Sequence, residues 1–92
     1  MKVGIEEIYK EIELNRLNEA QTLIDDLLKE NPNDEALYFL QGEIEYKQQH
    51  WGKAINSYNK VLELNPDYPE AKSRIEMVHR ILSFFNPDMF NP

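Results

Sequence analysis

A fixed period runs through most of this 92-residue chain. The stretch LNEAQTLIDDLLKENP ends at Pro32, and the similar stretch WGKAINSYNKVLELNP ends at Pro66, which sets the period at 34 (66 − 32). Within them Ala20 and Ala54 have the same spacing, and large apolar residues match at several further positions. Self-similarity at a fixed period indicates that each period is one structural unit that packs on the next. We therefore expect a row of units.

Each unit contains two amphipathic helices. Ahead of the proline-terminated run, apolar residues recur at intervals of three and four: Ile5, Ile8, Tyr9 and Ile12 in the first unit, and Leu37, Leu40 and Ile44 in the second. The run itself is helical and ends at Asn-Pro, because proline cannot continue a helix and restricts the residue before it. No segment shows the strict alternation of a half-buried strand, so the fold is expected to be all-α.

The region after Pro66 predicts a closing helix instead of a third unit. Its apolar residues form a seam at spacings of four and three, made of Ala71, Ile75, Val78, Leu82 and Phe85. Glu76 falls where the repeat requires a small residue, and the next Asn-Pro, at 86–87, comes far short of another period. We predict five helices, over about residues 3–15, 17–30, 34–48, 51–64 and 68–85.

The period and the W–xx–A–xxx–Y pattern followed by Pro resemble the tetratricopeptide repeat. The second unit carries the signature at Tyr38, Gly42, Trp51, Ala54, Tyr58, Val61 and Pro66. The first unit departs from it, with Ile8 where Gly is usual and with Gly4 and Glu11 where aromatics are common. The resemblance implies one domain over 1–92, a short right-handed α-solenoid of five antiparallel helices. Its parts are repeat 1 (1–34), repeat 2 (35–68), a capping helix (69–85) and a C-terminal tail (86–92).

Composition and charge exclude several classes of partner. The net charge of −7 disfavours binding to nucleic acid or to an anionic membrane surface. The three bases on the last predicted helix, Lys72, Arg74 and Arg80, are interpreted as part of a solvated face. The chain has no cysteine and no run long enough to span a membrane, and it shows no signal peptide, so a cytoplasmic location is the default expectation.

Side chains with catalytic or metal-binding chemistry are not grouped as such chemistry requires. His50 and His79 have no Cys, Asp or Glu at metal-ligand spacing. Pairs of acids such as Asp25–Asp26 fall on the solvent faces of amphipathic helices, where a carboxyl lacks the burial that tunes a catalytic group. We expect no enzyme activity, no metal and no cofactor.

The family resemblance implies a concave groove, lined by the first helices of successive units, that holds peptides or helices of a partner. The groove positions that transfer to this chain are Ile5, Tyr9, Phe39, Glu43, Tyr46, Lys47, Met77 and Ile81. The Lys/Asn clamp that some members use for a C-terminal carboxylate is missing, because Ile5, Tyr9 and Phe39 stand there. Phe39 and Tyr46 fit helix packing and a contact surface equally well, since other residues already supply a core face.

Two functions follow as hypotheses. The first is a non-catalytic interaction module that binds a protein or peptide segment in an apolar, aromatic groove. The alternative is a self-associating structural module, such as a homodimer, whose groove is covered by its own or a neighbour's tail. In the tail, Asn86-Pro87 is expected to end the last helix. Met89 and Phe90 either fray in solvent or fold back onto apolar surface near Met77, Ile81 or the Tyr46 face, in the same chain or a neighbour, and we favour folding back.

Overall fold

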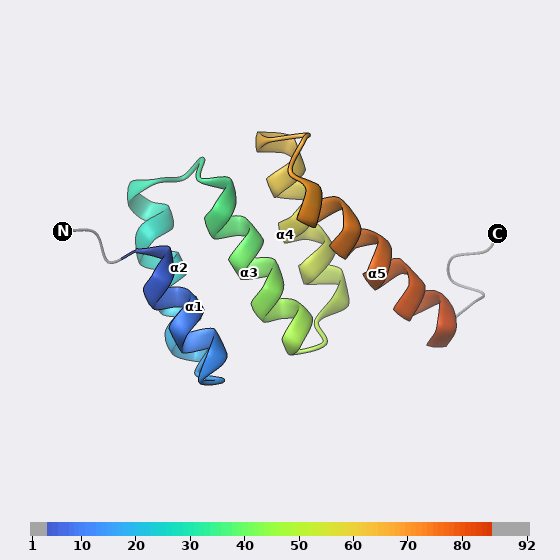
Figure 1. Ribbon diagram of the computed structural model, residues 1–92, viewed down its shortest axis with the longest axis horizontal. Helices are drawn as coiled ribbons and strands as arrows, with labels where there is room; N and C mark the ends of the chain where they lie inside the picture. Colours follow the sequence, from blue (N-terminus) through green and yellow to red (C-terminus); the bar gives the residue numbers. More distant parts are fainter. Residues whose placement is uncertain (1–3, 86–92) are drawn as a thin grey trace.

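The computed structural model describes residues 4–85. Over that range it contains five helices and no strand: α1 (Ile5–Glu13), α2 (Leu17–Glu30), α3 (Glu35–Lys47), α4 (Trp51–Leu64) and α5 (Pro69–Phe85). Each helix packs on the next one in sequence, and α1 also contacts α3, so the helices form a row (Figure 1). The predicted all-α solenoid is confirmed, while the predictions for Asn86-Pro87, Met89 and Phe90 concern residues outside the described range.

The sequence period is repeated in the backbone of the turns within each unit. Asn15 and Gln49 lie one period apart and have positive φ angles of 59° and 62°. In each turn the following N–H donates to the carbonyl five residues back, at 2.8 Å and 2.9 Å. A residue in the left-handed conformation followed by such a bond is the Schellman ending of a helix. The two units therefore turn from first to second helix in the same way.

Asn-Pro ends the second helix of each unit, as predicted. α2 ends at Glu30 and α4 at Leu64, so Asn31 and Asn65 are the capping residues. Each asparagine N–H still donates to a carbonyl four residues back, at 2.8 Å and 2.7 Å. The proline that follows has no N–H to extend the helix. The next helix begins four residues beyond each asparagine, at Glu35 and at Pro69.

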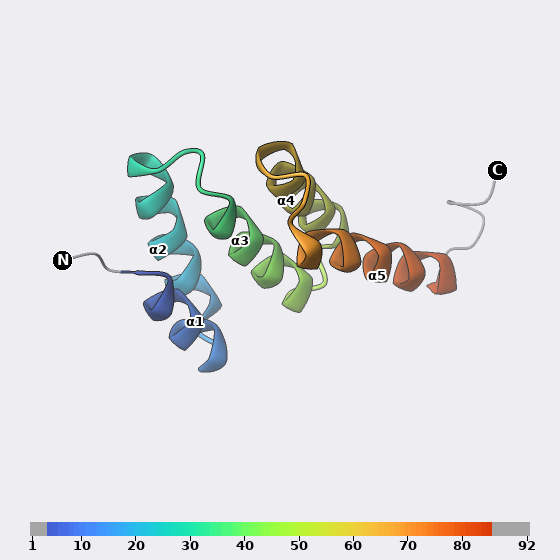
Figure 2. The same ribbon diagram turned by 45° about the horizontal axis from the view of Figure 1, so that its top comes forward.

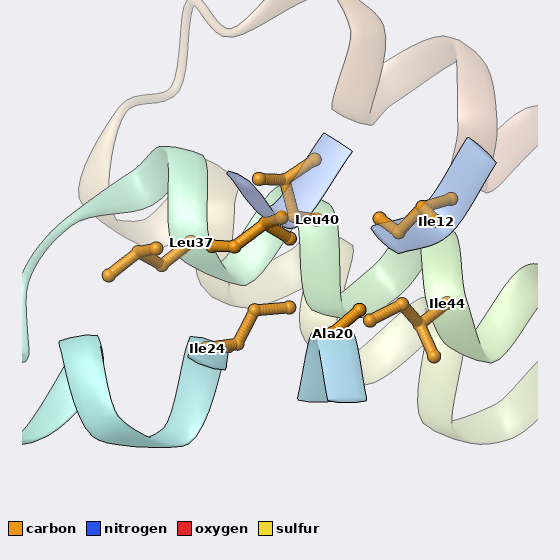
Figure 3. Packing of buried hydrophobic residues seen from close by; sticks show 7 residues of the cluster. Ile12, Ala20, Ile24, Leu37, Leu40 and Ile44 are labelled. Carbon is orange, nitrogen blue, oxygen red and sulfur yellow. The ribbon is translucent and has the colours of Figure 1, made fainter. Parts of the chain in front are cut away.

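Two apolar clusters follow one another along the row, and α3 contributes to both. The first joins α1, α2 and α3 through Ile8, Ile12, Ala20, Ile24, Leu37, Leu40 and Ile44, most of which Figure 3 shows. The second joins α3, α4 and α5 through Phe39, Ala54, Tyr58, Val61, Ala71 and Val78. Because α3 buries different faces in the two clusters, it connects the units mechanically.

The contact between the first and second helices uses a different pair of residues in each unit. In the second unit the fully buried Tyr58 lies against Gly42, where a β-carbon would come within 2.6 Å of the ring. The equivalent positions of the first unit hold Ile8 and Ile24, both fully buried. One glycine with one tyrosine is thus replaced by two residues of medium size. The exchange explains how Ile8 is accommodated where the family pattern has glycine.

The closing helix α5 packs on α4 through part of the predicted seam. Ala71 and Val78 are buried, and Ile75 and Leu82 are packed against the second cluster. The prediction for Phe85 is wrong, because its side chain is 70% exposed. The last turn of α5 extends beyond α4 (Figure 1), and none of the helices in residues 4–85 covers it.

A chain of polar side chains crosses from α2 to α4 on one side of α3. Gln21 donates to Gln41 at 3.3 Å, Gln41 donates to Ser57 at 3.2 Å, and the Ser57 hydroxyl donates to Glu45 at 2.5 Å. Burial raises the pKa of Glu45 above its usual range, although the hydrogen bond from Ser57 and the charge of Lys53 oppose the rise. The ionised carboxylate of Glu45 is therefore held at a cost to the folded state.

Replacing Glu45 with Gln keeps an acceptor for Ser57 and removes the desolvated charge. The pKa of Glu45 is higher in the folded protein than in the unfolded chain. Glu45 therefore contributes stability that is fully present below its unfolded pKa of about 4.3 and is lost as the pH rises through its folded pKa. We expect Glu45→Gln to be at least as stable as the wild type at pH 7, and its advantage to disappear near pH 4. Urea unfolding at both values checks this. A variant that is less stable at pH 7 would show that the ionised carboxylate favours folding.

Candidate functional site

A hollow of about 460 Å³ lies between the helices that open the two units and the closing helix. It is lined from α1, α3 and α5 by Tyr9, Ile12, Leu40, Glu43, Tyr46, Lys47, Arg74 and Met77. α1, α3 and α5 lie in that order along the molecule in Figure 1, and the sequence predicted a partner groove on these helices. We call this space the concave hollow.

Apolar side chains at two depths form most of the concave hollow. Ile12 and Leu40 belong to the first buried cluster and form its floor. Tyr9 on α1 and Met77 on α5 stand at its edges with exposed fractions of 49% and 40%. Because large apolar side chains on opposite edges face one space, the concave hollow offers a place in which a partner side chain could lose contact with water.

Glu43 is held by α4 and α5 together. The Tyr58 hydroxyl donates to Glu43 Oε1 at 2.6 Å, and Arg74 Nε donates to the same oxygen at 2.9 Å. Arg74 Nη2 also donates to Oε2, at 3.3 Å, so the guanidinium holds the carboxylate at both oxygens. The bond to Glu43 raises the pKa of Arg74, and burial followed by the same carboxylate raises the pKa of Tyr58 far above its usual range.

Phe39 lies beneath this group and does not line the concave hollow. Its side chain is only 5% exposed, and its ring centre is 5.7 Å from that of Tyr58 and 5.2 Å from that of Tyr68. The guanidinium carbon of Arg74 lies 5.9 Å from the Phe39 ring centre, within the range of a cation–π contact. The groove-facing placement of Phe39 is therefore corrected, because α4 and the turn before α5 cover it.

Tyr46 and Lys47 complete the wall at the end of α3. The Tyr46 ring meets Trp51 edge to face, with 5.2 Å between the ring centres. This contact with the first residue of α4 restrains the ring. The Lys47 side chain is exposed, and among residues 4–85 no ion pair holds its ammonium group. Since Arg74 neutralises Glu43, Lys47 leaves the concave hollow with a positive charge in an otherwise acidic chain.

Five of the eight predicted groove residues line the concave hollow: Tyr9, Glu43, Tyr46, Lys47 and Met77. Ile5 packs instead against the first cluster, and Ile81 is half-buried on α5 outside the concave hollow. Arg74 was assigned to a solvated face, and that assignment is wrong because it binds Glu43. One sign in the sequence was available, since Arg74 lies three residues after Ala71 and four before Val78, beside the buried seam.

The described part of the chain contains no group of three or more His, Cys, Asp or Glu side chains placed to hold a metal ion. None of its helices is both long and apolar enough to cross a membrane. The chemistry of the concave hollow is that of an apolar surface with one cation, Lys47, beside the paired Arg74 and Glu43.

Comparison with known proteins places the chain in a family. The family model described as TPR repeat matches residues 42–73, which include the second half of α3, all of α4 and the start of α5. The chain belongs to the tetratricopeptide-repeat family, whose repeats are generally protein–protein interaction modules.

One curated relative supports this assignment. A DnaJ homolog subfamily C member 7 homolog from Schizosaccharomyces pombe is 30% identical to this chain over 67 residues. The matched part is 73% of this chain, and it spans only 14% of the relative's own length. No solved structure gives a significant match.

Because Tyr58 donates a hydrogen bond to Glu43, removing the Tyr58 hydroxyl should reduce the loss of stability that removing Glu43 causes. Glu43→Ala should lower the free energy of unfolding by about 2 kcal/mol, because it leaves the buried Tyr58 hydroxyl without an acceptor. Tyr58→Phe alone should cost about 1 kcal/mol, yet be neutral or stabilising once Glu43 is Ala. A urea-unfolding double-mutant cycle checks this, and strictly additive losses would mean that the Tyr58–Glu43 bond contributes nothing.

Proposed function

We propose that this chain is a non-catalytic module that binds a segment of a partner protein in the concave hollow. The observation that carries the proposal is the position of that surface. It is formed jointly by α1, α3 and α5, with exposed apolar groups on opposite edges and a buried apolar floor. We also propose that the units divide at residues 1–34 and 35–68, with residues 69–85 as a cap.

The ion pair on Glu43 supports the proposal because it fixes the wall before a partner arrives. The carboxylate is held from α4 and α5, so the α5 edge of the concave hollow keeps its position relative to α3 without a ligand. A preformed surface loses less conformational entropy on binding than a mobile one. The pairing also removes the charge that would otherwise repel acidic segments. We propose that preferred partners present an apolar side chain to the hollow and an acidic group to Lys47.

Peptides selected from a random display library against the intact chain test the assignment. Tyr9→Ser and Met77→Ser should each weaken the selected peptides about ten-fold, as truncating an anchor contact does. Lys47→Glu should weaken those peptides that carry an acid. Leu14→Ser is the matched control, because Leu14 is 52% exposed and lies outside the concave hollow. Peptides that bind all the variants equally would show that the hollow is not the site.

Self-association is the second candidate, and the exposed end of α5 favours it. Phe84 and Phe85 are 82% and 70% exposed and stack on each other edge to face. Two large adjacent rings in water are a possible contact between copies. Sedimentation velocity over a wide range of concentrations, run on the protein used for peptide selection, separates the two candidates. A dimer lost in Phe84→Ser would support self-association, and a monomer throughout would exclude it.

A further inference from the structure

The first helix of the chain begins a full turn later than the repeat predicts. α1 and α3 end at Glu13 and Lys47, which are one period apart, so their last turns are in phase. α3 begins at Glu35, whereas α1 begins only at Ile5, after an extended Gly4 with φ −102°. α1 accordingly stops short of the turn between α2 and α3 (Figure 2). Gly4 is therefore extended where the equivalent residue of the second unit, Tyr38, is helical.

In the second unit this place is filled by Tyr38. Its ring packs against the second cluster, and its hydroxyl donates to the Pro32 carbonyl at 2.9 Å. The ammonium group of Lys60 lies 5.8 Å from the ring centre. One period earlier, Gly4 stands in place of Tyr38 and Asp26 in place of Lys60. The first unit thus lacks both the aromatic side chain and the cation beside it.

A second hollow, of about 1160 Å³, lies at this position, and both Gly4 and Asp26 line it. Its apolar lining comes from Ile5, Leu23, Leu27 and Leu37. Among the described residues, the charged side chains that line it are five acids and one base: Glu6, Glu7, Asp26, Glu30, Asp34 and Lys10. The ammonium group of Lys29 lies nearby, 3.9 Å from Asp26 Oδ1. We call it the N-terminal hollow. Its composition is an apolar floor inside a strongly acidic rim.

We propose that the N-terminal hollow is a second docking surface, which takes a basic segment of a partner protein carrying a Tyr or Phe between Lys or Arg residues. The aromatic side chain occupies the place that Tyr38 fills in the second unit and covers Leu23 and Leu27. The flanking cations meet Asp26 and Glu30, whose side chains lie at the surface. The negative charge of the rim and the positive charge of the partner segment favour their encounter, and the rim repels acidic segments.

The charge of the rim disfavours the C-terminal stretch and a second copy of the chain as occupants. The C-terminal stretch SFFNPDMFNP offers aromatic side chains, but it contains no Lys or Arg and carries Asp88. A second copy brings a further net charge of −7 toward the same acids. The concave hollow differs in sign, because Lys47 is its unneutralised charge. The two surfaces therefore select segments of opposite charge and do not compete for one ligand.

The direct test is titration of the full chain with a short fluorescent peptide that has one central Tyr flanked by Lys and Arg. The proposal predicts binding that weakens with salt, and methyl NMR shifts at Leu23 and Leu27 but not at Met77. Replacing the peptide's Tyr with Ala, or its bases with Glu, should remove binding. Gly4→Tyr, which supplies the missing ring in cis, should weaken the peptide at least ten-fold. The same variant should raise the melting temperature.

Charge-reversal variants separate local from long-range attraction. Asp26→Lys with Glu30→Lys should weaken the peptide several-fold more than Glu63→Lys with Glu76→Lys. The second pair makes the same change of net charge at positions outside the N-terminal hollow. Equal losses in the two double variants, together with normal binding by Gly4→Tyr, would overturn the proposal.

Two further outcomes would also contradict it. Binding only by a chain that starts at Gly4 would mean that residues 1–3 already occupy the site, and a dimer that Gly4→Tyr abolishes would make a second copy the occupant. Met77→Ser leaves this hollow intact. Peptide binding in that variant therefore distinguishes a failure here from a failure of the concave hollow.

Discussion

The phenol ring of Tyr58 lies in the space left by the missing side chain of Gly42, and the arrangement of the second unit depends on this contact. A β-carbon at residue 42 would come within 2.6 Å of Cε1 and 2.8 Å of Cδ1. α3 and α4 can therefore approach closely only because residue 42 is glycine. The same approach brings the Tyr58 hydroxyl to Glu43, one residue further along α3. Glu43 then holds Arg74 and, with it, the closing helix.

The N-terminal hollow lies where the chain departs from a uniform repeat. In the first unit Ile8 and Ile24 replace the glycine and tyrosine, which closes the core without a hydroxyl to anchor a carboxylate. Gly4 stands where the second unit has Tyr38, so the start of α1 lacks that aromatic side chain. At the other end α5 presents Met77 and Arg74 to the concave hollow. The repeat sets the positions of the helices, and the substitutions determine which surfaces remain open.

The number and order of the helices could be predicted from the sequence, because their signals are local. Asn-Pro ends α2 and α4 whatever surrounds them, and apolar spacing indicates which face of each helix is buried. The interpretation of Phe39 as a surplus aromatic was less reliable, because its burial depends on Tyr58 in α4 and Tyr68 before α5, both far from it in sequence. The ion pair of Arg74 with Glu43 likewise joins two distant helices, and no local pattern marks such a pair. Phe85 continues the apolar spacing of α5, but spacing could not show that α5 is longer than α4 and that its last turn therefore extends beyond α4.

Substitution of alanine for glycine at two positions tests the dependence on the Tyr58 contact most directly. Gly42→Ala should lower the free energy of unfolding by about 1–3 kcal/mol and weaken peptides that bind the concave hollow, because the ring must shift and carry Glu43 with it. Gly52→Ala, also within a helix, places its methyl group where nothing lies within 4 Å, and it should stabilise the protein by about 0.5–1 kcal/mol. Urea unfolding of the two variants and the wild type measures both effects. Equal or greater stability of Gly42→Ala, with unchanged peptide affinity, would contradict the account.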